Sequence, residues 1–216
     1  MKSLGELLAN GPAAFIGADE FEAEARRTRS AEAREIRGRL PRFLQTPKPD
    51  ELAARCHPAL LAAVQAWQWG DGDLFLIGPT GTGKTTAAGY LFRRLLGQAV
   101  AKGGEAWDLA RWLRWYSAAD IATARRIHPL GQGDPPAVVE SCNARLLVLD
   151  DGGWDIDVTE TSVILNERYE RQWPTVMTSG KTREELTAHY GAAVIRRLRE
   201  AGGKRAVVVD CFDPKA

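Results

Sequence analysis

Short apolar runs, separated by turn residues and helical stretches, recur along most of the chain. They lie at residues 74–77, 112–116, 146–149, 174–179 and 206–209. Runs of this length are typical of β-strands, and the fully apolar run 146–149 is typical of a strand inside a parallel sheet. Helical patterns alternate with these runs. The alternation predicts an α/β fold with a doubly wound, parallel sheet of five strands.

The segments between the strands carry helix signals. Residues 50–69 predict two short helices broken at Pro58, and residues 85–96 predict a helix closed by Gly97. Residues 98–110 are expected to be irregular. Capping-box patterns begin a helix at Ser117, which ends before Pro129, and a helix at Thr182, which runs to about residue 200. A further helix is expected over residues 158–172.

The N-terminal segment has a different pattern. Residues 18–39 are rich in charged side chains and poor in apolar ones, and acid-first pairs such as Glu22–Arg26 favour a helix. This helix is either a solvated tail or an arm that binds a partner. Prolines at positions 41, 47 and 49 indicate an extended linker. We therefore expect an N-terminal helical arm, residues 1–39, and one main domain, residues 40–216.

Composition narrows the class of protein. The 216 residues suit one α/β domain with a short extension, and 44% hydrophobic with 26% charged residues excludes a disordered chain. With a net charge of +1, any contact with DNA must come from a local patch. Cys56, Cys142 and Cys211 are scattered, which argues against a metal site or a disulfide frame. No run approaches a membrane helix and no signal peptide is visible, so a cytoplasmic protein without membrane contact is expected.

The strongest chemical signal is the pattern G-x-x-x-x-G-K-T between the first strand and the helix that follows it. Its glycines let the backbone turn its N–H groups toward phosphate oxygens, its lysine reaches the β- and γ-phosphates, and its threonine hydroxyl binds Mg²⁺. The positive end of the following helix adds to the site. The residues expected to bind ATP are Gly78, Pro79, Thr80, Gly81, Thr82, Gly83, Lys84, Thr85 and Thr86.

Two acidic residues follow the apolar run 146–149. Asp150 is expected to hold Mg²⁺ through the water shell of the ion, beside the Thr85 hydroxyl, and Asp151 is expected to act on the attacking water. A further cluster, Arg196, Arg197 and Arg199, lies near the end of a helix. These arginines either compensate the helix dipole or supply an arginine finger to a neighbouring subunit.

Several motifs in order resemble the DnaC/IstB-type branch of the AAA+ ATPases, over about residues 38–213. LPRF at 40–43 resembles the family's I-P-x-R-F, and LLVLDDGG at 146–153 resembles L-L-V-L-D-D-L-G. The other matching segments are 74–85, WYSAADI at 115–121, 166–168, 174–179 and 194–198. The resemblance implies that the main domain is an AAA+ ATPase domain without a C-terminal lid. It also implies the strand order 204–211, 74–77, 175–178, 146–149, 112–116.

The resemblance also implies roles for single residues. Arg197 is the finger candidate because it directly precedes Leu198, and Asp151 takes the position of the acid that activates water. The family places an asparagine after Thr178 and Ser179, whereas this chain has Gly180. Polar contact with the nucleotide is therefore expected either to come from Ser179 or Thr178 or to be lost, and hydrolysis is expected to be slow.

The function implied is that of a Mg²⁺-dependent ATPase that loads a replicative, DnaB-like helicase onto single-stranded DNA. The arm would bind the helicase, and ATP would order a homo-oligomer of about hexamer size. Candidate DNA contacts are Arg125, Arg126 and His128, which equally fit a solvated helix end. Alternatives are an IstB-like transposition helper that binds duplex DNA and a nucleotide-gated adaptor with little hydrolysis. A small-molecule kinase is disfavoured because no arginine-rich lid is visible.

Overall fold

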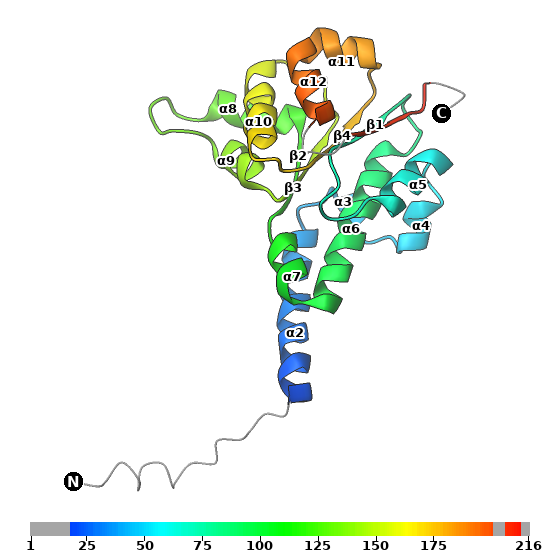
Figure 1. The fold of residues 1–216 in the computed structure, drawn as a ribbon. Coiled ribbons are helices and arrows are strands. Elements are labelled where there is room, and N and C mark those ends of the chain that lie inside the picture. The colour runs from blue at the N-terminus through cyan, green and yellow to red at the C-terminus, as the bar shows by residue number, and fades with distance from the viewer. Residues whose placement is uncertain (1–17, 201–205, 213–216) are drawn as a thin grey trace, which may run out of the picture.

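A parallel sheet divides the protein into two helical layers (Figure 1). The computed structural model describes residues 18–200 and 206–212. The strands, in the spatial order β2-β3-β4-β1-β5, all run parallel. They are β1 (Leu74–Ile77), β2 (Leu113–Ser117), β3 (Leu146–Asp150), β4 (Thr175–Ser179) and β5 (Val207–Asp210). The predicted α/β class and the expected strand order are both confirmed.

Successive strand residues face opposite layers because side chains alternate along a strand. Leu74 and Leu76 of β1 pack into a core with the first layer of helices. This layer contains α2 (Ala18–Arg37), α3 (Arg42–Gln45), α4 (Pro49–Ala53), α5 (Pro58–Ala66), α6 (Lys84–Lys102) and α7 (Gly104–Ala110). The long helix α6 lies at its centre and contacts every other helix of the layer.

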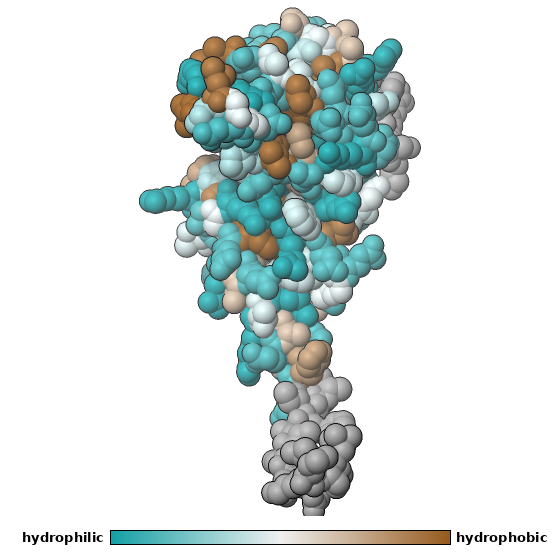
Figure 2. Space-filling model, turned by 90° about the vertical axis from the view of Figure 1, so that its left-hand side faces the viewer, coloured by the Kyte–Doolittle hydropathy of each residue, from teal (hydrophilic) through white to brown (hydrophobic). Residues whose placement is uncertain are grey.

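The second layer covers the opposite face. Phe75 and Ile77 of β1 pack into its core together with Met177 of β4. The helices of this layer are α8 (Ala118–Ile127), α9 (Pro136–Asn143), α10 (Val158–Glu170), α11 (Arg183–Tyr190) and α12 (Ala192–Glu200). Figure 2 shows the side of the molecule that carries α8 and α9 as mostly hydrophilic, with hydrophobic side chains in small separate groups. None of the helices within the described ranges has the length and apolar character needed to cross a membrane.

Three of the predictions for helices differ from the structure. Helix α6 does not end at Gly97 but continues to Lys102, because the apolar positions Ala99 and Val100 extend its packed face. Residues 104–110, expected to be irregular, form α7. The single helix expected from residue 182 to 200 is two helices, since Gly191 has φ +85° and ends α11.

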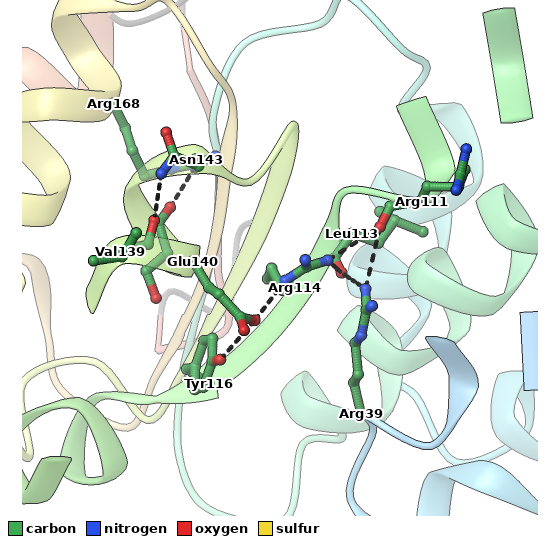
Figure 3. Close-up of polar contacts among 10 residues, drawn as sticks. Arg39, Arg111, Leu113, Arg114, Tyr116, Val139, Glu140, Asn143 and Arg168 are labelled. Carbon is green, nitrogen blue, oxygen red and sulfur yellow. Dashed lines mark hydrogen bonds and ion pairs between the residues drawn. The ribbon is translucent and has the colours of Figure 1, made fainter. Parts of the chain in front are cut away.

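The arm is attached to the body of the protein along its second half. Ile36 of α2 is only 4% exposed and belongs to the core of the first layer. The Arg29 Nε donates a hydrogen bond to the Val100 carbonyl oxygen at 3.2 Å. The Arg39 Nη1 donates to the Leu113 carbonyl oxygen at 2.6 Å, on the edge strand β2 (Figure 3). The segment after residue 40, which was expected to be an extended linker, contains α3 and the start of α4 instead. The arm residues 1–17 lie outside the described part of the chain.

A buried group of hydrogen-bonded polar side chains closes the amino ends of the strands, at the opposite end of the sheet from the glycine-rich loop 78–85. The guanidinium of Arg168, 1% exposed, donates to the Thr175 hydroxyl and to the carbonyl oxygens of Ser141 and Ala144, each at 2.8 Å. Asp73, also 1% exposed, accepts from the Thr175 backbone N–H at 2.6 Å. Burial raises the pKa of Asp73 to about 7, although the Thr175 hydrogen bond and Arg168 oppose the shift.

Candidate nucleotide site

The glycine-rich loop connects the buried strand β1 to the first turn of α6. Gly81 and Gly83 have φ values of +91° and +85°, a region that side chains other than glycine rarely occupy. A Cβ on Gly83 would lie 2.3 Å from the Arg55 carbonyl oxygen. The segment before α5 is held in place because the His57 N–H donates to the Thr82 carbonyl oxygen at 3.0 Å. Glycine is thus required at position 83 for both conformation and space.

Lys84 lies inside the curve of this loop. Its Nζ donates to the carbonyl oxygens of Gly78 at 2.7 Å and Pro79 at 2.8 Å, and the residue is 8% exposed. Burial lowers the pKa of Lys84, and the nearby carboxylate of Asp151 opposes this shift. The ammonium group of Lys84 thus lies against two backbone carbonyl oxygens of the loop, at the positive end of α6.

Thr85, in the first turn of α6, meets Asp150 at the carboxyl end of β3. The Thr85 hydroxyl donates to Asp150 Oδ1 at 2.9 Å, and the Thr178 hydroxyl donates to the same oxygen at 2.5 Å. Burial raises the pKa of Asp150, and its hydrogen bond with Thr178 opposes this shift. A hydroxyl and a carboxylate are oxygen donors of the kind that Mg²⁺ and its bound waters prefer. Thr85 and Asp150 bring these two groups within hydrogen-bond distance of each other, so the pair fits a hydrated Mg²⁺ ion.

Asp151 begins the loop between β3 and α10. Its φ of +54° is unusual for a residue with a side chain, and its N–H donates to the Thr178 hydroxyl at 3.0 Å. The hydroxyl of Thr178 therefore connects both acidic residues. Asp151 is exposed, and it faces the same cavity as Lys84 and Thr85. A carboxylate in this position is accessible to solvent water beside the loop.

An open cavity of about 690 Å³ covers the loop. We call it the nucleotide cavity, after the ligand that the sequence predicts for this loop. Of the expected nucleotide residues, Thr80, Gly81, Gly83, Lys84, Thr85, Thr86 and Asp151 line it. Gly78, Pro79, Thr82, Asp150 and Ser179 do not line it. Phe43, Arg55 and Trp154 also line the cavity and were not predicted. Phe43 lies in the LPRF motif and is 55% exposed. The sequence does not indicate this exposure, because an aromatic residue is usually expected in the core.

The hydroxyl of Ser179 forms hydrogen bonds with backbone groups of its own chain. It donates to the Gly152 carbonyl oxygen at 2.6 Å and accepts from the Lys181 N–H at 3.0 Å. Gly180 lines the cavity next to it, and a Cβ there would have Trp154 as its nearest neighbour, at 3.5 Å. The hydroxyls of Thr178 and Ser179 thus both hold the loop after β3 rather than face the cavity.

A buried carboxylate connects the loop after β3 to α11. The Tyr190 hydroxyl accepts from the Gly153 N–H at 2.7 Å and donates to Asp155 Oδ1 at 2.8 Å. The His189 Nε2 lies 2.9 Å from the same oxygen. Burial, followed by the charge of Asp155, raises the pKa of Tyr190. The position of Asp151 is therefore supported by a helix that is more than thirty residues away along the chain.

The candidate finger lies outside the cavity of its own chain. The Arg197 Nη1 donates to Asn166 Oδ1 at 2.6 Å, across the contact of α12 with α10. Arg196 is exposed, while Arg197 is half-buried. Neither residue lines the nucleotide cavity.

The candidate DNA residues do not form one free basic face. Arg125 forms ion pairs with Glu160 at 2.6 Å and Asp134 at 2.5 Å. These hydrogen-bonded carboxylates raise the pKa of Arg125. Arg126 is exposed, and His128 is half-buried with an Nε2 that has no hydrogen-bond partner among the described residues. Of the three side chains, the structure leaves Arg126 the most accessible.

Solved structures with a similar fold exist. A primosome component from Streptococcus pyogenes serotype M3 matches with a TM-score of 0.52 and 18% identity, over 81% of this chain and 94% of that one. The DnaC helicase loader matches with a TM-score of 0.49 and 19% identity, over 69% of this chain and 85% of that chain. DnaI matches with a TM-score of 0.49 and 18% identity, over 78% and 85%. No family model matches the sequence, and the comparison with curated proteins gave no match.

At these identities the likeness concerns the fold. The chain therefore shares the fold of the primosome component, and in this chain that fold is a parallel five-stranded α/β sheet with a glycine-rich loop between β1 and α6.

Proposed function

We propose that this protein is a Mg²⁺-dependent ATPase. The observation that carries the proposal is the arrangement of Lys84, Thr85 and Asp150 around one glycine-rich loop, beneath an open cavity. Lys84 would exchange its bonds to the Gly78 and Pro79 carbonyls for phosphate oxygens. Thr85 and Asp150 would hold Mg²⁺, which neutralises charge on the phosphates when it is bound.

Asp151 would orient the attacking water and accept its proton. It is the carboxylate that lines the cavity, whereas Asp150 is 6% exposed and bonded to two hydroxyl groups. Arg197 would reach the γ-phosphate of a neighbouring subunit in an ATP-bound homo-oligomer of about hexamer size. Its place outside its own cavity supports a role between subunits.

We further propose that ATP binding drives the loading of a replicative helicase onto single-stranded DNA. The motifs shared with the DnaC/IstB branch support this, and so does the fold likeness to a primosome component. The helicase would contact the N-terminal arm, residues 1–39. DNA would contact the end of α8, where Arg126 is exposed and Arg125 is held by carboxylates.

A loading assay tests this role. Circular single-stranded DNA, the replicative helicase of the same cell and the protein are mixed with ATP, and helicase bound to the circle is measured after gel filtration. We expect the protein to increase bound helicase and the Lys84→Ala variant not to do so. Equal amounts of bound helicase with and without the protein would contradict helicase loading, but not ATP binding.

One observation favours a second candidate, a nucleotide-gated adaptor that hydrolyses ATP very slowly. Gly180 has no side chain, and the hydroxyls of Thr178 and Ser179 are held by the loop after β3. The space beside Gly180 accepts a side chain, since no atom lies within 3.4 Å of its Cβ position. Gly180→Asn should therefore raise the hydrolysis rate if a missing polar group limits turnover. An unchanged rate would show that turnover is not limited at this position.

A further inference from the structure

A second cavity, of about 430 Å³, lies between α2, α4 and α6 and shares no lining residue with the nucleotide cavity. One face of α2, from Ser30 to Arg37, forms one wall, and α6 forms the other. We call it the arginine groove. Its arginines are Arg34, Arg37, Arg93 and Arg94, and its accessible apolar surface includes Ala33, Pro49, Tyr90 and Val100.

The residues that line the groove carry positive charge and no negative charge. No aspartate or glutamate lines it, and none of its four arginines forms an ion pair within residues 18–200 and 206–212. Arg34 and Arg37 project from α2 as exposed side chains. Four cations around one apolar surface create a local positive potential on a protein whose net charge is only +1.

Two of these arginines are held rigidly in the wall. The Arg93 Nη1 donates to the carbonyl oxygens of Leu44 and Pro47, and the Arg94 Nη2 donates to those of Val64 and Trp67. The Arg94 Nε is buried and has no partner among the described residues. Burial lowers the pKa of Arg93, and the charge of Arg37 lowers it further. These two half-buried charges are therefore fixed in position, and a bound anion would stabilise them.

We propose that the arginine groove is the docking site for an acidic, amphipathic segment of a partner protein. Apolar side chains of that segment would contact the partly exposed Ala33, Tyr90 and Val100, while its carboxylates would pair with Arg34 and Arg37. The stretch of α2 that lines the groove is about 10 Å long, or two helical turns, which suits a short helix. This proposal does not depend on the proposed ATPase activity.

The surroundings favour a peptide over nucleic acid. Carboxylates follow the groove residues along the same helices, at Glu35 on α2 and at Asp50 and Glu51 on α4. A phosphate backbone needs a track of positive charge that continues beyond a few residues, and these carboxylates interrupt it. The apolar floor, by contrast, matches leucine-like side chains.

A binding experiment with designed peptides tests the proposal. The probe is a fluorescein-labelled helical peptide with leucine at every third or fourth position and glutamate between them. The same peptide with lysine in place of glutamate, and a labelled oligo-dT strand, are the comparisons. Anisotropy is measured at low ionic strength with the full chain, and binding of a fluorescent ATP analogue is measured in parallel.

Two variants block the groove by different means. Arg34→Glu/Arg37→Glu reverses the charge, and Gly97→Phe fills the space, because a Cβ at Gly97 meets no atom within 4 Å. Arg26→Glu/Arg27→Glu is the matched control, since it makes the same change of charge on exposed positions of α2 that do not line the groove. ATP binding should be unchanged in all three, because none of these residues lines the nucleotide cavity.

We expect the acidic peptide to bind, and both groove variants to weaken it about tenfold or more while the control does not. The lysine peptide should not bind. The proposal is overturned if the wild-type protein does not bind the acidic peptide, or if the groove variants bind it as well as the control does. It is also overturned if Gly97→Phe weakens the binding of oligo-dT and leaves the binding of the acidic peptide unchanged, because the groove would then be a nucleic-acid site.

Discussion

At the scale of single residues, the loop from Gly78 to Thr85 needs glycine at position 83 for two separate reasons, its backbone conformation and the lack of space for a side chain. Gly83 combines a φ of +85° with a Cβ position 2.3 Å from a backbone carbonyl oxygen. Gly191 has the same φ but open space around it. Gly191→Ala should cost only backbone strain, about 1–3 kcal/mol. Gly83→Ala should cost more and also abolish ATP binding. Urea unfolding and nucleotide titration measure both effects; equal losses of stability in the two variants would contradict this account of Gly83.

A second residue-scale prediction concerns the buried carboxyl group of Asp73. Its pKa is raised from 3.8 to about 7, so the folded protein holds a proton that the unfolded chain loses as pH rises. The free energy of unfolding should therefore fall between about pH 4 and pH 7 through this group, and not change further above pH 7. Asp73→Asn removes the titration. The stability of the variant relative to wild type should rise across that range and then level off. A constant difference from pH 4 to pH 8 would show that folding does not raise the pKa of Asp73.

At the scale of elements, α12 carries two neighbouring arginines with different surroundings. Arg197 is hydrogen-bonded to Asn166 at 2.6 Å, and Arg196 is exposed. If Arg197 acts on a neighbouring subunit, Arg197→Ala and Lys84→Ala proteins should each be inactive and should recover ATPase activity when mixed. Recovery arises because an intact site can pair with an intact finger. Arg196→Ala should cost less than Arg197→Ala. Absence of recovery under subunit exchange, or the reverse ranking, would reject Arg197 as the finger.

The elements also show which features sequence reasoning could reach. The loop from Gly78 to Thr85 was predictable because its chemistry resides in consecutive residues between a strand and a helix. The continuation of α6 past Gly97 was not, since packing of Ala99 and Val100 against the core overrides the local cost of glycine. The attachment of α2 through Ile36 was also missed, because one buried residue in a charged helix gives almost no periodic signal.

At the scale of the whole molecule, the fold brings distant segments to one end of the sheet. The sheet order followed from the resemblance, but the approach of Arg55 to Gly83 and the bridge from Tyr190 to Asp155 depend on tertiary packing. The nucleotide cavity and the arginine groove share helix α6, whose first turn holds Lys84 and whose second half carries Arg93, Arg94 and Gly97. One rigid helix thus connects the candidate ATP site to the candidate partner site.

The central claim, that this loop binds MgATP, is tested most directly by titrating the protein with a fluorescent ATP analogue. We expect saturable, Mg²⁺-dependent binding by the wild-type protein, and the same binding by Lys102→Ala, a control at the exposed end of α6. Asp151→Asn should bind but not hydrolyse. Lys84→Ala should lose binding, because the phosphates lose the ammonium group inside the loop. Binding by Lys84→Ala with wild-type affinity would contradict the account.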